Sequence, residues 1–203
     1  MMDSMPRVSA DHLAARRQQI LDAARTCFLR NGFHATSMQD VIKEANLSVG
    51  AVYRYFPSKN DLITALAGQV IGEISSVFAS VATAEPPPAL HMVMARVVDA
   101  ATANSGPNGA LRLALHIWSE SLRDEALAEF VAGVYGRLRD TMVLIARRAQ
   151  QHGELPADAD PMAVGSVLLA VLPGYALQRI LTGQPEPETF QTGLRTLLEV
   201  RAR

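Results

Sequence analysis

The sequence predicts an all-α protein in which a small three-helix domain over residues 1–66 precedes a larger helical domain over residues 67–203. Aromatic residues make up only 5% of the chain, whereas Ala and Leu dominate its hydrophobic 49%, and this composition favours helices over sheets. Apolar residues recur at intervals of three and four positions, and no stretch of useful length alternates as a strand would. Breaks rich in proline and glycine at 85–88 and 104–109 divide this pattern into segments of ordinary helix length.

The first helix is expected over residues 11–30. Asn31-Gly32 should end it, because glycine readily takes the left-handed conformation that follows a helix end. Cys27 is the only cysteine and lies on the apolar face, which indicates a small buried hydrophobe rather than a redox sensor. The apolar face consists of Leu13, Ile20, Ala24, Cys27 and Phe28.

Two short helices joined by a tight turn should follow. Thr36 is expected to cap the first, with Gln39 at the spacing of a capping box. Ser48 is expected to cap the second, which spans residues 49–55 and stops before Pro57, because the residue preceding a proline disfavours the helical conformation. Such a pair is typical of the helix-turn-helix unit, whose second helix enters the DNA major groove. A purely structural helical hairpin has the same periodicity.

The residue types on the second helix favour DNA binding over the structural alternative. Small residues at its start allow a close approach of the backbone, and Tyr and Arg can hydrogen-bond phosphates or base edges. Arg16 and Arg17, near the start of the first helix, would meet either phosphate or solvent. The residues that are unusual for a buried helix are Ser48, Gly50, Tyr53, Arg54 and Tyr55, and Lys59 adds a positive charge on the same side.

Residues 13–66 resemble, without a gap, the N-terminal domain of the TetR/AcrR family of bacterial transcriptional repressors. The rest of the chain resembles that family only in its helical layout and in the weaker motif Gly153-Glu154-Leu155-Pro156. The matching residues are Ile20-Leu21-Asp22-Ala23-Ala24, Phe28, Gly32-Phe33, Thr36-Ser37, Asp40-Val41, Ala45, Ser48, Gly50, Val52-Tyr53, Tyr55-Phe56, Lys59 and Leu62.

The resemblance implies a set of DNA contacts. A homodimer would bind a palindromic operator in double-stranded DNA, because the two-fold symmetry of the protein matches that of the site. Val49 and Ala51 would contact thymine methyl groups, and Arg54 a guanine or a phosphate. The expected phosphate contacts are Thr36, Ser37, Tyr53, Tyr55 and Lys59, and the expected base-reading positions are Val49, Gly50, Ala51 and Arg54, with Ser48 at the start of the helix.

The remaining helical segments are separated by clear breaks. The helix that begins at Lys59 links the two domains, so a change in the C-terminal domain can tilt it and move the recognition helix. Pro161 suits the first position of a later helix, with Asp160 as its cap. The expected helices are 59–83, 89–103, 110–122, 124–151, 161–181 and 187–200.

The segment 161–181 is apolar on nearly all sides, so it should be buried on all sides. In so small a domain this indicates a subunit interface, although a purely intramolecular core is the alternative. The resemblance implies a four-helix bundle built from the last two helices of each subunit. The expected interface residues are Val164, Leu168, Val171 and Tyr175 in this helix and Leu194, Leu197 and Leu198 in the last one.

No catalytic constellation is visible, and we expect no enzyme activity, no cofactor and no metal site. The five histidines are scattered, and none has a partner at the spacing that places two ligands on one helix face. We expect instead a pocket between helices for a small hydrophobic effector. Plain core packing is the alternative for each apolar candidate. The candidate lining residues are Met92, Arg96, Arg112, His116, Trp118, Tyr135, Met142 and Gln178.

The sequence therefore predicts a ligand-responsive repressor that an effector releases from its operator. A small-molecule binding or sensing protein that no longer binds DNA is the alternative, and the intact segment 48–59 argues against it. The N-terminus has no apolar signal core, and no apolar run reaches the ~20 residues that cross a bilayer. We accordingly expect a cytoplasmic protein with no membrane partner.

Overall fold

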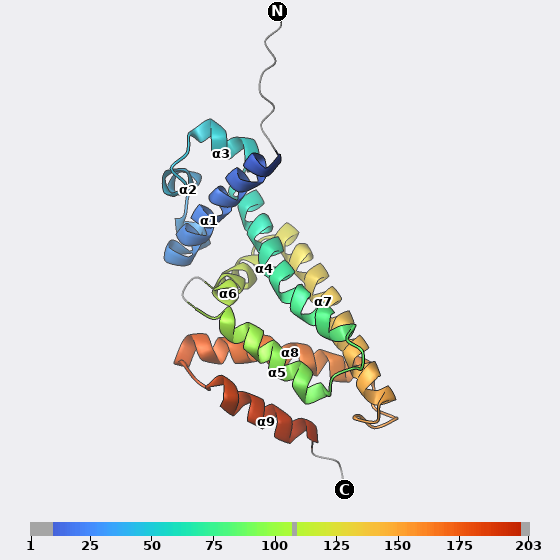
Figure 1. Ribbon diagram of the computed structural model, residues 1–203. Coiled ribbons are helices and arrows are strands. Elements are labelled where there is room, and N and C mark those ends of the chain that lie inside the picture. The colour runs from blue at the N-terminus through green and yellow to red at the C-terminus, as the bar shows by residue number, and fades with distance from the viewer. Residues whose placement is uncertain (1–9, 107–108, 200–203) are drawn as a thin grey trace, which may run out of the picture. The chain divides into compact units, whose positions relative to one another are not determined.

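The computed structural model describes residues 10–106 and 109–199, except for the side chains of Glu73, Ile74, Val77 and Val81. The chain forms two compact units, and the boundary between them falls between Ala67 and Gly68. The helices of the described residues, shown in Figure 1, are α1 (Ala10–Ala35), α2 (Met38–Glu44), α3 (Val49–Tyr55), α4 (Lys59–Ala82), α5 (Leu90–Ala103), α6 (Ala110–Ser121), α7 (Glu125–Gln151), α8 (Pro161–Thr182) and α9 (Pro187–Glu199). The prediction of an all-α fold is confirmed, and helix boundaries differ from the expected ones by only a few residues.

The N-terminal unit is a three-helix arrangement completed by the first turns of α4. Gly32 has φ 78° and ψ 167°, so the regular part of α1 stops one residue earlier, as predicted. The Phe28 and Phe33 rings meet edge to face with centroids 4.6 Å apart, which closes the end of the core. The core residues include Ile20, Leu21, Ala24, Cys27, Phe28, Phe33, Val41, Val52, Phe56, Leu62, Ile63 and Leu66.

The start of α2 differs from the prediction. Ser37, not Thr36, is the N-cap: its hydroxyl accepts from the backbone N of Asp40 at 3.2 Å, and the Asp40 carboxylate accepts from the backbone N of Ser37 at 2.8 Å. The predicted capping box therefore exists one residue later, with Asp40 in place of Gln39. Threonine and serine are adjacent and both cap well, so sequence spacing alone did not separate them.

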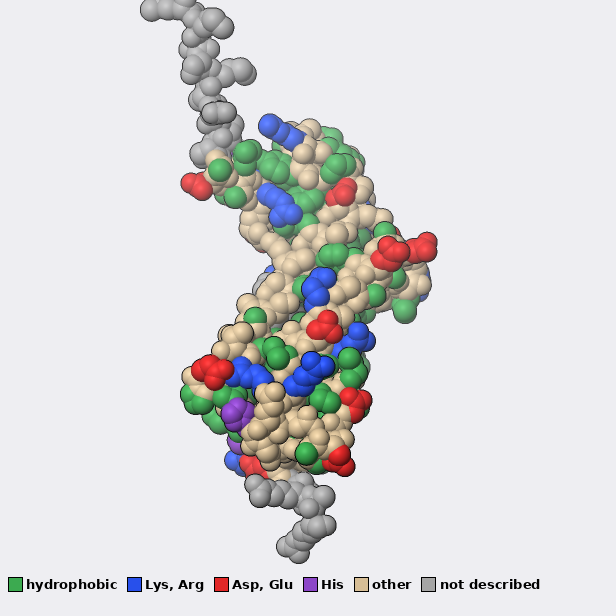
Figure 2. Space-filling model, turned by 90° about the vertical axis from the view of Figure 1, so that its right-hand side faces the viewer, with side chains coloured by type: hydrophobic (Ala, Val, Ile, Leu, Met, Phe, Trp, Pro, Cys, Tyr) green, Lys and Arg blue, Asp and Glu red, His purple; other side chains and the backbone are tan. Residues whose placement is uncertain are grey.

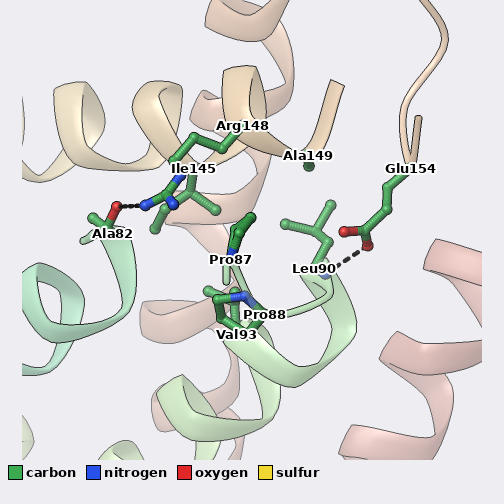
Figure 3. Close-up of a pocket in the computed structure, with 9 residues that line it drawn as sticks. All are labelled: Ala82, Pro87, Pro88, Leu90, Val93, Ile145, Arg148, Ala149 and Glu154. Carbon is green, nitrogen blue, oxygen red and sulfur yellow. Dashed lines mark hydrogen bonds between the residues drawn. The ribbon is translucent and has the colours of Figure 1, made fainter. Parts of the chain in front are cut away.

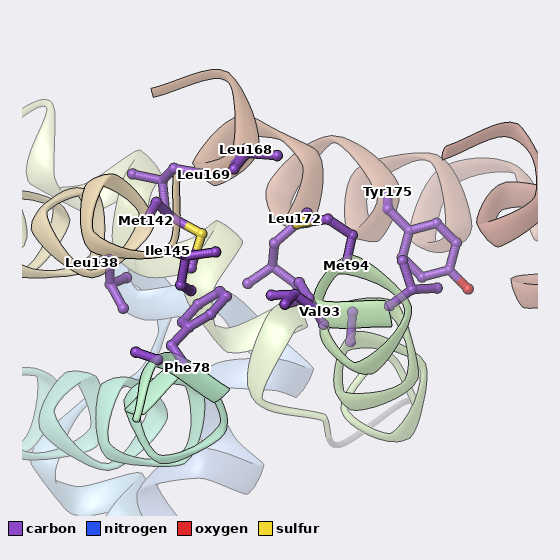
Figure 4. Packing of buried hydrophobic residues seen from close by; sticks show 14 of the residues in the cluster. Phe78, Val93, Met94, Leu138, Met142, Ile145, Leu168, Leu169, Leu172 and Tyr175 are labelled. Atoms are coloured by element: carbon purple, nitrogen blue, oxygen red, sulfur yellow. The ribbon is translucent and has the colours of Figure 1, made fainter. Parts of the chain in front are cut away.

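The C-terminal unit is built around the contact of α7 with α8; α5 packs against α8, and α9 packs against α5. Figure 4 shows part of the buried cluster, in which Met142 and Ile145 of α7 lie near Leu169 of α8 and Leu138 of α7 lies above Phe78 of α4. Leu168 and Leu172 of α8 and Val93 and Met94 of α5 belong to the same cluster. The two helices cross closely at Gly165. A Cβ atom there would lie 2.8 Å from the backbone N of Val143, so the crossing requires glycine.

One face of α8 is turned into this core, which corrects part of the predicted subunit interface. Leu168 and Tyr175 are buried within the single chain, because they point toward α7 and α5, and they have no surface to offer a second subunit. The opposite face is exposed at Val167 and Leu181. Because apolar residues surround α8 on nearly all sides, the helical period did not predict which side faces the core.

Among the described residues, α8 is also long and apolar enough to cross a membrane by length and composition alone. The expectation that no apolar run has this property was therefore wrong. A core helix of a soluble protein passes the same test, and only 33% of the apolar window of α8 is buried in the chain.

Candidate nucleic-acid interface

Helix α3 presents one face to the core and one to the surroundings. Val52, on the inner face, is fully buried, and Phe56 closes the same side after the helix ends. The outer face keeps the residues that were predicted to meet DNA. Ser48, Val49, Gly50, Tyr53 and Arg54 are exposed, whereas Ala51 and Tyr55 are half-buried. The structure thus brings together on one surface the base-reading residues predicted from the sequence.

The short turn before α3 is fixed by backbone conformation and by capping. Asn46 has φ 52°, a left-handed conformation that asparagine tolerates better than most residues. The Ser48 hydroxyl then accepts from the backbone N of Ala51 at 3.3 Å, which begins the helix as predicted. Gln19 of α1 donates to the Ala45 carbonyl at 2.8 Å, so the end of α2 is tied to α1. No sequence signal had marked Gln19.

Thr36 does not contact phosphate through its side chain. It is 1% exposed, and its hydroxyl lies 2.8 Å from the Gly32 carbonyl and 3.2 Å from the Cys27 carbonyl. The prediction for this side chain is therefore wrong, because its hydroxyl is buried and donates to the Gly32 carbonyl at the kink in α1. Ser37 is exposed and remains a predicted phosphate contact. Its hydrogen bonds lower the pKa of the Asp40 carboxyl.

Lys59 holds the start of α4 against the segment before α2. Its ammonium donates to the Phe33 carbonyl at 2.8 Å and to the Thr36 carbonyl at 3.2 Å, and the side chain is half-buried. An ammonium has three N–H donors, so one remains for a phosphate. The structure therefore gives Lys59 a positioning role that sequence spacing did not indicate.

The two arginines near the start of α1 are occupied within the unit. Arg16 donates to the Gln19 side chain at 2.8 Å. The Arg17 guanidinium lies 5.2 Å from the centre of the Phe56 ring, a cation–π contact between α1 and the end of α3. Arg17 nevertheless stays exposed, so the same contact holds its charge beside α3.

The eight predicted effector contacts differ in how far the structure buries them. Trp118 and Tyr135 meet edge to face with ring centroids 6.2 Å apart, and burial raises the pKa of the Tyr135 hydroxyl. Met142 is fully buried in the core of the C-terminal unit. Arg112 and His116 are half-buried, and the Nε atom of Arg112 is buried without a hydrogen-bond partner. The residues Met92, Arg96 and Gln178 lie exposed on the surface.

The C-terminal unit shows no single-sign charge patch on the face that is drawn in space-filling form (Figure 2). On the face drawn in Figure 2, acidic and basic side chains of this unit are interspersed, and neither sign forms a continuous patch. The described residues contain no group of three or more His, Cys, Asp and Glu side chains that could hold a metal ion.

A capped helix-turn-helix with an exposed second helix, followed by a separate helical unit, defines the class of helix-turn-helix transcription factors. Two family models match the chain: residues 20–66 match the model described as bacterial regulatory proteins of the tetR family, and residues 91–202 match the C-terminal model of BetI-type transcriptional repressors. The chain belongs to the TetR family and is a DNA-binding transcriptional regulator.

A named relative agrees with this assignment, and solved structures share the fold. The transcriptional regulator UidR of Escherichia coli K12 is 28% identical over 182 residues, which is 90% of both chains. The structure of Salmonella enterica GusR covers 95% of this chain and 97% of its own, with 27% identity and a TM-score of 0.74. The structure of the SmeT–triclosan complex covers 91% of this chain and 88% of its own, with 24% identity and a TM-score of 0.74.

Proposed function

We propose that this regulator binds a palindromic operator as a homodimer, represses transcription there and is released by a small-molecule effector. The observation that carries the proposal is the outer face of α3, where Val49, Gly50 and Arg54 are exposed while Val52 anchors the helix from below. Val49 and Ala51 supply apolar contacts for thymine methyl groups, and Arg54 donates to guanine or phosphate. Ser37, Tyr53, Tyr55 and the third N–H of Lys59 supply the phosphate contacts.

The homodimer is supported by the apolar surface that α8 and α9 leave uncovered. Val167 is 67% exposed, Leu181 72% and Leu197 75%. Burying such large apolar side chains against a second subunit removes them from water and would stabilise a dimer. The half-buried residues Val164 and Val171 of α8 and Leu194 and Leu198 of α9 belong to the same proposed surface. Val167 and Leu181 here replace Leu168 and Tyr175 of the sequence prediction.

Sedimentation tests the proposed interface. Val167→Glu and Leu197→Glu each place a charge in the apolar contact, and we expect the protein to sediment as a monomer at micromolar concentration. Thr196→Glu, beside Leu197 and also exposed, adds the same charge as a matched control. A wild-type protein that sediments as a monomer would contradict the proposed dimer.

A small-molecule effector is supported by the SmeT–triclosan complex and by the half-buried aromatic pair Trp118 and Tyr135. Mostly apolar walls with a few polar groups suit a hydrophobic compound. Because the operator lies in the cell's DNA, the protein works in the cytoplasm. In the proposed mechanism the effector binds better to a conformer whose two recognition helices no longer match the half-sites, and a near-complete switch requires a preference of ~5.5 kcal/mol.

Selection of bound sequences from a random DNA pool tests the operator. Wild-type protein should enrich a palindrome, and Arg54→Ala should weaken binding to it by about 1–3 kcal/mol with relaxed preference at one position of each half-site. Arg139→Ala, an exposed arginine of α7, removes the same charge away from α3. Absence of enrichment would move the assignment to a small-molecule binding protein that no longer binds DNA.

A further inference from the structure

Two charged residues close the connection between α4 and α5. Arg148 of α7 donates to the Ala82 carbonyl, to the Ala84 carbonyl at 2.9 Å and to the Glu85 carboxylate at 2.5 Å. Ala82 is the last residue of α4, so the guanidinium lies at the carbonyl end of that helix. A positive charge there also complements the negative end of the helix dipole.

Glu154 acts at the other end of the same connection. Ala89, the N-cap of α5, offers no side-chain hydrogen bond, and the Glu154 carboxylate instead accepts from the backbone N of Leu90 at 2.7 Å. Figure 3 shows Arg148 directed to Ala82 and Glu154 directed to Leu90 on either side of Pro87 and Pro88. Arg148 and Glu154 are called here the α4–α5 clamp.

The space between the clamp residues is too small for an organic ligand. Pro87, Pro88, Leu90, Val93 and Ile145 line it together with the clamp, and it has room for about one water molecule. The side chain of Arg148 is 18% exposed, whereas Glu85 is 77% exposed. The hydrogen bonds to the Ala82 and Ala84 carbonyls therefore contribute most to keeping Arg148 at the end of α4, since the ion pair with the exposed Glu85 adds little. The cluster serves to position helix ends rather than to bind an effector.

The clamp acts on the helix that also carries a contact of the DNA-binding unit. α4 is one continuous helix from Lys59 to Ala82. Lys59 ties its first turn to the segment before α2, and Arg148 ties its last residue to α7. A helix held at both ends has fewer orientations than one held at only one end.

We propose that the α4–α5 clamp sets the operator affinity by restricting α4 to orientations in which the recognition helices fit two half-sites. This inference rests on the proposed operator binding. Opening the clamp lowers the fraction of molecules that are competent to bind, and the apparent Kd rises by the inverse of that fraction. Arg148 is thus a positioning residue, remote from the DNA, that holds the far end of α4.

The test compares operator and non-specific DNA affinity for three variants. Arg148→Met removes the guanidinium but keeps a long side chain, and we expect at least a tenfold rise in the operator Kd with little change in the Kd for random DNA. Arg148→Lys keeps one ammonium near the carbonyls and should recover part of the loss. Arg147→Met, at the exposed neighbouring position of α7, is the matched control and should bind as wild type.

Two outcomes would overturn the proposal. Equal operator affinity for wild type and Arg148→Met, with both folded by circular dichroism, would show that the clamp does not restrict α4. A parallel loss of operator and random-DNA affinity would show general damage to the protein instead. If wild type itself selects no operator, the proposed function fails. A second measurement still tests the clamp in that case. Gln39→Cys places one spin label on α2 of each subunit of the proposed homodimer, and the distance between the two labels reports on the orientation of α4. A distance distribution that Arg148→Met leaves unchanged would overturn the proposal.

Discussion

The hydroxyl of Tyr175 lies 2.8 Å from the hydroxyl of Thr102 inside the C-terminal unit. Thr102 already donates its single O–H to the Val98 carbonyl at 2.8 Å, so Tyr175 is the donor and Thr102 the acceptor. The Tyr175 ring also lies 4.7 Å from the Phe190 ring, which joins α5, α8 and α9 around one fully buried side chain.

Because Tyr175 donates to Thr102, we expect the two substitutions Tyr175→Phe and Thr102→Val to differ in the unfolding free energy that they cost. Tyr175→Phe leaves Thr102 bonded to Val98 and should cost about 1 kcal/mol of unfolding free energy. Thr102→Val leaves the tyrosine hydroxyl buried without an acceptor and should cost more, about 1–3 kcal/mol. Urea denaturation of the single and double variants measures both. A smaller cost for Thr102→Val than for Tyr175→Phe would reverse the assignment of donor and acceptor.

Lys59→Met separates a positioning role from a direct phosphate contact. Loss of the bonds to Phe33 and Thr36 should lower the unfolding free energy by about 1.5–3 kcal/mol, because both involve a charged donor. Lys43→Met, at an exposed position of α2, should change it little. Operator affinity measured against salt completes the test: a slope unchanged from wild type supports positioning, whereas a slope reduced by about one identifies a phosphate contact.

The buried thiol of Cys27 gives a pH dependence with a defined sign. Burial, with Glu44 adding to it, raises the pKa of this thiol above its ordinary 9.0. The folded state therefore favours the neutral thiol, and its contribution to stability is full below the ordinary pKa and lost as pH rises through the folded value. Urea denaturation should show a steeper fall above pH 9.0 for wild type than for Cys27→Ala. Equal falls would assign the alkaline loss to other groups.

Gly165→Ala tests the close crossing of α7 and α8. The added methyl group would meet the backbone of Val143 at 2.8 Å, and the helices must separate to accept it. We expect a loss of about 1–3 kcal/mol of unfolding free energy. Gly174→Ala is a matched control in the same helix, with no atom within 4 Å of the added Cβ, and should stabilise the helix by up to about 1 kcal/mol. Equal effects of both substitutions on thermal unfolding would contradict the crossing.

Local signals predicted the elements of this fold well. Proline at 57 and 161, serine at 48 and glycine at 32 act on the backbone within one or two residues, and the helices begin or end where those residues require. The sequence also named Ser48, Val49, Gly50, Tyr53 and Arg54 as DNA contacts, and all five are exposed.

Long-range pairing could not be predicted in the same way. The partners of Lys59 and Arg148 are backbone carbonyls, which every residue carries, so no sequence pattern marks them. Tyr175 and Met142 were assigned to an interface and a pocket because an apolar residue on an apolar helix suits a core, a subunit contact and an effector site equally well. Only the packing of α7 and α5 against α8 distinguishes these roles.

Gly50→Leu tests whether the α3 backbone comes close to DNA at Gly50, with no expected loss of thermal stability. No atom lies within 4 Å of a Cβ added at Gly50, and leucine favours helices more than glycine does, so thermal stability should stay equal or rise. The added side chain would stand where the DNA groove must come close, and the operator Kd should rise at least tenfold. Gly133→Leu, an exposed helical glycine of α7, should leave the Kd unchanged. A Gly50→Leu protein that binds as wild type would remove Gly50 from the interface and shift base reading toward Arg54.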